Sequence, residues 1–189
     1  MSLSLHPYNK VPLWKNPHNK PFSMDFPIVE VNYSTEAELY NEGIRIILDE
    51  MDDAHFNTTN VKAKMSQWYM HKDYKEFSWV CSKAENLAIR NSPHQVDYEV
   101  SDCWGAVYKK GEYTKKHDHW PNVWSFVYYV DCCEECSPLL FHEAPQGTHY
   151  IYPKIGKMVL FPSVLVHSVP KQTCNHDRIM VAGNIGLSK

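Results

Sequence analysis

The stretch Gly111 to Asp131, which reads GEYTKKHDHWPNVWSFVYYVD, holds the residues around which the chain is organised. It contains the triplet His117-Asp118-His119, and an apolar run follows. Successive side chains of an extended strand point to opposite faces, so His117 and His119 are expected to share one face while Asp118 points away. Two imidazoles on one face can chelate a single metal ion.

A third metal ligand is expected at His167. This histidine ends an apolar run that begins after Gly156, and eleven residues later Arg178 opens another. The ordered set is therefore H-x-H, then H, then R. His142 and His149 lie on predicted strands and could line a pocket, but packing or backbone partners are the commoner role for such residues.

This order of residues resembles the iron(II)- and 2-oxoglutarate-dependent oxygenase superfamily, and most of all its small bacterial and phage branch. The resemblance covers Val96 to Gly186 and rests on His117-Asp118-His119, Val127-Tyr128-Tyr129, Leu160-Phe-Pro-Ser163, His167, Arg178 and Asn184. It implies a double-stranded β-helix that binds Fe(II), 2-oxoglutarate and O₂ and hydroxylates an unidentified substrate, with release of succinate and CO₂. His117, His119 and His167 would be the metal ligands.

The cosubstrate 2-oxoglutarate carries a remote carboxylate that needs a fixed cation. Arginine meets a carboxylate with two parallel N–H bonds, and the resemblance assigns this role to Arg178. Tyr108 is a further expected cosubstrate contact by resemblance. Ser125, Tyr128 and Tyr129 are additional candidates, although strand alternation admits only one of the two tyrosines to the pocket.

The metal ligand set leaves alternatives open. Most of the superfamily has Asp or Glu where this chain has His119, and a bulge that turned Asp118 inward would restore a carboxylate ligand. Three neutral ligands also suit a cupin-type dioxygenase that does not use 2-oxoglutarate. A third reading is a non-catalytic jelly roll that binds a ligand or partner.

The remaining pattern predicts a mainly β, α+β fold of one domain. Residues 1–33 are expected to form an irregular arm with an edge strand near Ile28 to Val31, and residues 34–92 to supply two helices that brace one sheet. The first helix should begin at a capping box, Thr35 to Glu38, and the second should end near Asn91. Residues 96–186 carry short strand-like runs typical of the β-helix core.

Composition restricts the partners. The 189 residues carry a net charge of −3, which favours neither nucleic acid nor an anionic membrane, and no apolar stretch is long enough to span a bilayer. A cytoplasmic protein is expected, and its six cysteines are then reduced thiols. Cys133-Glu-Glu-Cys136 has the spacing of one half of a zinc site, but a plain turn is the preferred interpretation because no second pair of ligands completes the site.

Overall fold

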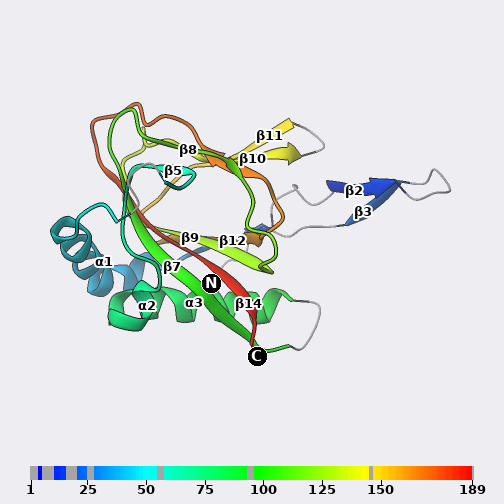
Figure 1. Ribbon diagram of the computed structural model, residues 1–189, viewed down its shortest axis with the longest axis horizontal. Coiled ribbons are helices and arrows are strands. Elements are labelled where there is room, and N and C mark those ends of the chain that lie inside the picture. The colour runs from blue at the N-terminus through cyan, green and yellow to red at the C-terminus, as the bar shows by residue number, and fades with distance from the viewer. Residues whose placement is uncertain are drawn as a thin grey trace.

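Two facing antiparallel sheets form the body of the protein (Figure 1). The structure, a computed structural model, describes residues 4–5, 11–15, 21–24, 28–54, 58–92, 96–144 and 147–188, and the side chains from residue 28 onward except those of 143, 144 and 147. In spatial order the larger sheet comprises β1 (Ser4–Leu5), β4 (Val29–Asn32), β12 (Lys157–Pro162), β9 (Trp124–Asp131), β14 (Arg178–Leu187), β7 (Tyr98–Tyr108) and β6 (Lys64–Met65). The predicted double-stranded β-helix is confirmed.

The smaller sheet lies across the larger one and carries part of the H-x-H stretch. In spatial order its strands are β11 (Gly147–Ile151), β10 (Leu139–Ala144), β13 (His167–Val169), β8 (Tyr113–His117) and β5 (Val61–Lys62). A separate pair, β2 (Val11–Lys15) and β3 (Pro21–Met24), lies in the N-terminal arm, which was predicted to be irregular. The strand predicted near Ile28 to Val31 is β4, but it is not an edge strand, because it pairs with β12 on one side and with β1 on the other.

Helices cover the outer face of the larger sheet, as predicted (Figure 1). They are α1 (Ser34–Glu50), α2 (Met70–Asp73) and α3 (Lys75–Asn91). The predicted apolar stripe of α3 is buried throughout, from Phe77 to Ala88. The predicted capping box of α1 does not form, because the N-cap is Tyr33, two residues before Thr35, and the Ser34 N–H donates to the Asn32 side chain at 2.8 Å. Within the described residues, no helix is long and apolar enough to cross a membrane.

Two strand predictions differ from the structure. The two strands predicted at Val96 to Val100 and at Trp104 to Tyr108 are replaced by one continuous strand, β7, which begins at Tyr98 and whose pairing with β14 shifts register between Asn184 and Ile185. A bulge of this kind lets a strand bend without ending. The single strand predicted between Val61 and Met65 is divided, and its halves β5 and β6 belong to different sheets.

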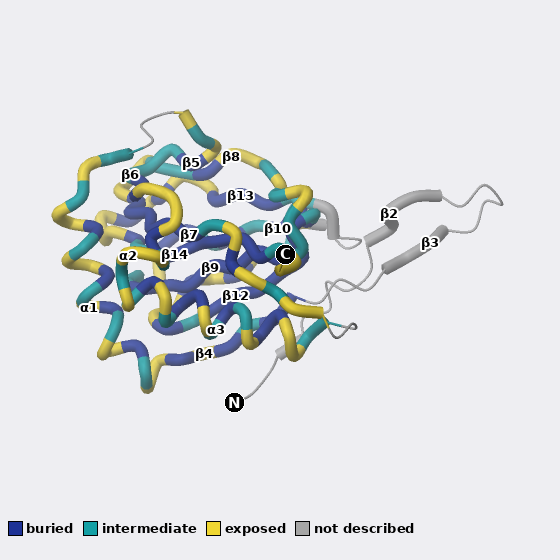
Figure 2. The backbone as a smooth tube through the Cα atoms, turned by 60° about the horizontal axis from the view of Figure 1, so that its bottom comes forward, coloured by how far each residue is buried: buried dark blue, intermediate teal, exposed yellow. Residues whose placement is uncertain are grey.

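Alternation along the central strands produces two apolar layers, visible as the buried backbone between the helices and the smaller sheet (Figure 2). On β9, Phe126, Tyr128 and Val130 face the helices, whereas Val127 and Tyr129 face the smaller sheet. Residues of β7 and β14 divide in the same way. The inner layer between the sheets is where the predicted site residues gather.

Candidate active site

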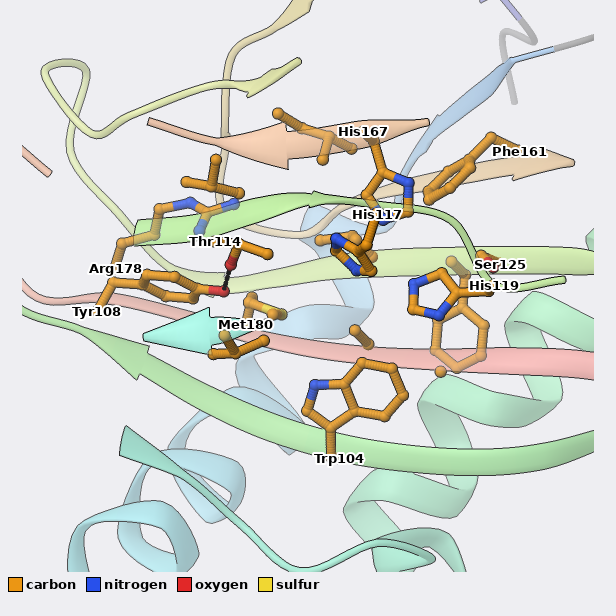
Figure 3. Close-up of a pocket in the computed structure, with 17 residues that line it drawn as sticks. Trp104, Tyr108, Thr114, His117, His119, Ser125, Phe161, His167, Arg178 and Met180 are labelled. Atoms are coloured by element: carbon orange, nitrogen blue, oxygen red, sulfur yellow. Dashed lines mark hydrogen bonds between the residues drawn. The ribbon is translucent and has the colours of Figure 1, made fainter. Parts of the chain in front are cut away.

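Three histidines meet at the edge of the inner layer. His117 and His167 are directly opposite each other on the paired strands β8 and β13. His119 lies just beyond the end of β8, where its backbone N–H donates to the Ser163 carbonyl at 2.8 Å. The ring centroids of the three imidazoles are 4.4 to 5.0 Å apart, and one nitrogen of each ring lies within 4.8 Å of the others. The three predicted ligands are therefore together (Figure 3).

Backbone carbonyls orient two of these rings. Nδ1 of His117 lies 2.8 Å from the Lys115 carbonyl, and Nδ1 of His167 lies 2.8 Å from the Leu165 carbonyl. A carbonyl only accepts hydrogen bonds, so the proton of each neutral ring is assigned to Nδ1. The lone pair of Nε2 is then free to bind a metal, the arrangement found in most metal-binding histidines.

The surroundings keep all three imidazoles neutral at physiological pH. Burial lowers the pKa of His119 to about 3, with a further contribution from His117. Burial is also the main cause that lowers the pKa of His117 and, far more, of His167. Neutral imidazoles bind a cation without first losing a proton.

Aromatic side chains hold the imidazoles from two sides. Phe161 packs edge-on against His167 with centroids 4.9 Å apart, and Trp104 lies 6.1 Å from His119. Both belong to the inner layer, and neither was predicted as a specific contact of the site. Their packing restricts ring rotation and limits the entry of water.

Asp118 does not join the three histidines. Its side chain is exposed, and its Oδ1 accepts a hydrogen bond from the Trp120 backbone N–H at 3.0 Å. The pairing of β8 with β13 shifts register between Thr114 and His117, but this irregularity does not bring the Asp118 carboxylate into the histidine group. The alternative in which Asp118 takes the place of His119 is not the arrangement found.

Arg178 occupies the opposite end of the same cavity (Figure 3). It is the first residue of β14 and pairs with Tyr108, the last residue of β7. Its guanidinium lies 4.9 Å from the centre of the Tyr108 ring and 5.1 Å from that of Tyr129. Only 1% of the residue is exposed, yet its Nε and Nη1 have no hydrogen-bond partner among the described residues.

Hydroxyl groups surround this arginine. The Tyr108 hydroxyl shares a 2.7 Å hydrogen bond with Thr114 of β8, which also lines the cavity. The Tyr129 hydroxyl is buried and without a hydrogen-bond partner in the described part of the chain. Burial raises the pKa of Tyr108 and of Tyr129, while the charge of Arg178 partly offsets this effect, so both phenols remain protonated donors.

Ser125 lines the cavity, but its hydroxyl is engaged within the protein. It donates to Asn184 Oδ1 at 2.8 Å and lies 2.8 Å from the Ser163 hydroxyl. Asn184 in turn donates to Asp102 at 2.8 Å. This chain of polar groups runs from Ser163, just after β12, through β9 and β14 to Asp102 of β7, which indicates a positioning role for Ser125.

Tyr128, proposed above as a cosubstrate contact, faces away from the cavity. It packs in the layer under the helices, and its hydroxyl donates to Asn41 Oδ1 of α1 at 2.8 Å. Its neighbour Tyr129 takes the place beside Arg178. The alternation of β9 decides between them, and the sequence held no clue to which face was inward because both faces are apolar.

Replacing Tyr128 with phenylalanine is expected to destabilise the fold. The change leaves a buried amide oxygen of Asn41 unpaired, which costs about 1–3 kcal/mol of unfolding free energy. Tyr129→Phe is the matched control, because its hydroxyl has no partner to lose among the described residues. Denaturant unfolding of both variants measures the difference, and equal stabilities would contradict the assignment of Tyr128.

Comparisons with known proteins agree on the architecture. No protein-family model matches the chain, and no curated protein sequence matches it. Among solved structures, a Pseudomonas putida prolyl-4-hydroxylase is similar with a TM-score of 0.65 and 17% identity, over 86% of this chain and 93% of that one. The viral collagen prolyl hydroxylase of Paramecium bursaria Chlorella virus-1, solved with 2-oxoglutarate, has a TM-score of 0.61 and 16% identity over 84% and 94%.

A third similar structure is HygX of Streptomyces hygroscopicus with nickel and 2-oxoglutarate bound, at a TM-score of 0.65 and 10% identity over 84% of this chain and 82% of that one. The chain has the fold of these oxygenases. At such low identity the likeness establishes the fold, and the activity has to be argued from the site itself.

Proposed function

We propose that the protein is an iron(II)- and 2-oxoglutarate-dependent oxygenase that hydroxylates a substrate bound beside His119. The observation that supports it is one cavity with a metal-binding end and a carboxylate-binding end. Three neutral imidazoles gather at the first end, and a buried arginine with unpaired donors lies at the second. A ketoacid with a remote carboxylate has complementary groups at its two ends.

The three histidines suit a divalent first-row metal ion. Imidazole is a ligand for Fe(II), Co, Ni, Cu and Zn, and three ligands leave coordination positions for a bidentate cosubstrate and for O₂. His117 and His167 would hold the ion through Nε2, since their Nδ1 atoms are engaged by carbonyls. His119 would complete the set.

The arginine end suits a carboxylate. A buried cation without a counter-ion is costly, and the Nε and Nη1 donors of Arg178 have no partner in the described chain. A carboxylate between Arg178 and the Tyr129 hydroxyl would satisfy both. Thr114 of the smaller sheet shares a hydrogen bond with the Tyr108 hydroxyl and would hold the Tyr108 ring against the guanidinium of Arg178.

When bound, Fe(II) with 2-oxoglutarate and O₂ supplies the oxidising chemistry, in which the cosubstrate becomes succinate and CO₂ while a C–H bond is hydroxylated. The chain contributes orientation and exclusion of water. Arg178 sets the position of the cosubstrate, and the apolar side chains of Met180, Ala182 and Val127 line the space between the two ends.

A neighbouring cavity supplies space for the primary substrate. It has a volume of about 190 Å³ and shares His117, His119 and Trp104 with the site. Trp68 packs against Trp104 at its wall, with ring centroids 4.9 Å apart. A substrate in this cavity would meet the metal on the side of His119.

A three-histidine dioxygenase that does not use 2-oxoglutarate is the second candidate. The observation that favours it is His119 itself, which replaces the usual carboxylate and leaves the site with only neutral ligands. In that reading Arg178 would bind a carboxylate of the primary substrate. The two candidates differ in what must be present for O₂ to be consumed.

The test is succinate formation by the Fe(II)-loaded protein. The primary substrate can be left out of this assay, because an oxygenase of this kind is expected to convert 2-oxoglutarate to succinate slowly without it. We expect succinate only when Fe(II), 2-oxoglutarate and O₂ are all supplied, and none from an Arg178→Ala variant. O₂ consumption that is independent of 2-oxoglutarate would favour the second candidate.

A further inference from the structure

A second group of metal-binding side chains lies outside the histidine site. Cys133 and Cys136 belong to the loop after β9, and Cys174 to the loop that leads from β13 into β14. All three sulfur pairs, Cys133 with Cys136, Cys133 with Cys174 and Cys136 with Cys174, are 3.6 Å apart. The sequence favoured a plain turn at Cys133 and Cys136 because no further ligand was apparent. In the structure Cys174, from a distant loop, provides a third sulfur beside this pair.

The size of this sulfur triangle matches one tetrahedral metal ion. Zinc binds thiolate sulfur at about 2.3 Å, and two ligands of a tetrahedron at that radius are about 3.8 Å apart. A disulfide would instead bring two sulfurs to about 2.05 Å and leave the third aside. Three equal separations favour a shared ion over a covalent pair.

The side chain of Gln172 supports the same conclusion. Its Oε1 accepts a hydrogen bond from the Ser137 backbone N–H at 2.9 Å, and a backbone N–H can only donate. This fixes the amide so that Nε2 faces the sulfurs, 3.1 Å from Cys136 and 3.0 Å from Cys174. Gln172 is 2% exposed, so this donor is built into the interior.

Two of the three sulfurs, those of Cys136 and Cys174, thus accept N–H hydrogen bonds. The Cys136 sulfur also receives the Cys133 backbone N–H at 3.3 Å. N–H donors that point at sulfur suit thiolates, and such outer partners orient and stabilise the ligands of metal sites. Two converging N–H groups on a buried cysteine are hard to explain for a plain turn.

We propose that Cys133, Cys136 and Cys174 bind one zinc ion as thiolates, with solvent as the fourth ligand. His176 is only two residues beyond Cys174, but its Nε2 is hydrogen-bonded to Asp131 at 3.1 Å, so the imidazole is engaged elsewhere. Thiolate ligands select zinc over the hard divalent ions. Each thiol that binds releases its proton to the solvent.

The site would tie two loops that bear on the catalytic cavity. Cys174 lies four residues before Arg178, and the Cys133 loop directly follows β9, which carries Tyr129. Ser137 also donates its hydroxyl to the Lys171 carbonyl at 3.0 Å, so the loops already lie against each other. A bound ion would hold the start of β14 in register with the end of β9.

Cobalt(II) substitution tests the proposal independently of the oxygenase activity. In protein treated with chelator and reductant, added Co²⁺ is expected to produce a thiolate-to-cobalt charge-transfer band and the strong visible bands of a tetrahedral site. Zinc should abolish both stoichiometrically. The histidine site contains no sulfur and cannot produce the charge-transfer band.

Three serine variants locate the band. Cys133→Ser should lose it, and because Cys133 is partly exposed, the change removes little packing. Cys132→Ser, at the adjacent position, should keep it. Cys81→Ser should also keep it, which separates the proposed site from the His71, Cys81 and Cys103 group near α3. Thermal unfolding of each apo protein verifies the fold.

Several outcomes would overturn the proposal. These are the absence of a charge-transfer band in the wild-type protein, its persistence in Cys133→Ser, its loss in Cys81→Ser, or a disulfide within the group in protein purified without reductant. A wild-type protein that purifies with bound zinc, and that loses it in Cys133→Ser but not in Cys132→Ser, would support it.

Discussion

Replacing His167 with alanine is expected to weaken Fe(II) binding by more than about 100-fold, since the loss of a mere outer partner of a metal ligand already costs about 10–100-fold. His167 is the most buried of the three histidines and stands directly opposite His117 across the β8–β13 pair. Without His167 only two histidine ligands hold the ion, and water can displace them more easily than it can displace three. Anaerobic Fe(II) or Co(II) titration of the apo protein measures the effect.

His142→Ala is the matched control for this variant. His142 lies on β10, beside β13, and its Nε2 is hydrogen-bonded to the Ser168 hydroxyl at 2.7 Å, so it is not one of the proposed ligands. It should retain metal affinity within a few-fold. If His142→Ala and His167→Ala lost the metal equally, the effect would be structural and the ligand assignment would be wrong.

Arg178→Ala is expected to weaken 2-oxoglutarate binding severely while Fe(II) binding remains close to that of the wild-type protein. Truncating one partner of a buried, hydrogen-bonded charge pair costs about 2–5 kcal/mol, which corresponds to about a 30- to 4,000-fold loss of affinity. Isothermal titration of the metal-loaded protein with 2-oxoglutarate, under anaerobic conditions, measures it.

Two further variants sharpen this prediction. Arg178→Lys keeps the charge but cannot form two parallel bonds, so we expect an intermediate affinity. Arg45→Ala removes a half-exposed arginine that lies 3.6 Å from Asp131, and it should bind 2-oxoglutarate normally. Loss of metal in Arg178→Ala, with the fold intact, would make Arg178 a structural residue rather than the cosubstrate anchor.

The grouping of the three histidines was predictable from one local rule and from the fold that the family resemblance implies. Strand alternation predicted that His117 and His119 share one face. Their rings are 4.7 Å apart in the structure, although β8 ends at His117 and His119 lies beyond it. The antiparallel layout of the β-helix then brings the strand of His167 against β8. The two helices and their position over one sheet followed from the spacing of apolar residues, most completely in α3.

Other features depended on contacts that the sequence does not encode locally. Tyr128 and Tyr129 are both buried, so alternation alone separated them without saying which faced the cavity. The partner of Cys133 and Cys136 is a single cysteine about forty residues away, with no spacing motif to announce it. Tyr98–Tyr108 was divided in the prediction because the polar residues Ser101 and Asp102 interrupt its apolar pattern.

Anaerobic titration of the Fe(II)-loaded protein with 2-oxoglutarate tests the central proposal most directly. A ketoacid chelated to Fe(II) gives a weak visible charge-transfer band. The proposal predicts that this band appears, saturates with 2-oxoglutarate, and is absent from both His167→Ala and Arg178→Ala. Metal-loaded protein that shows no band at saturating 2-oxoglutarate would contradict it.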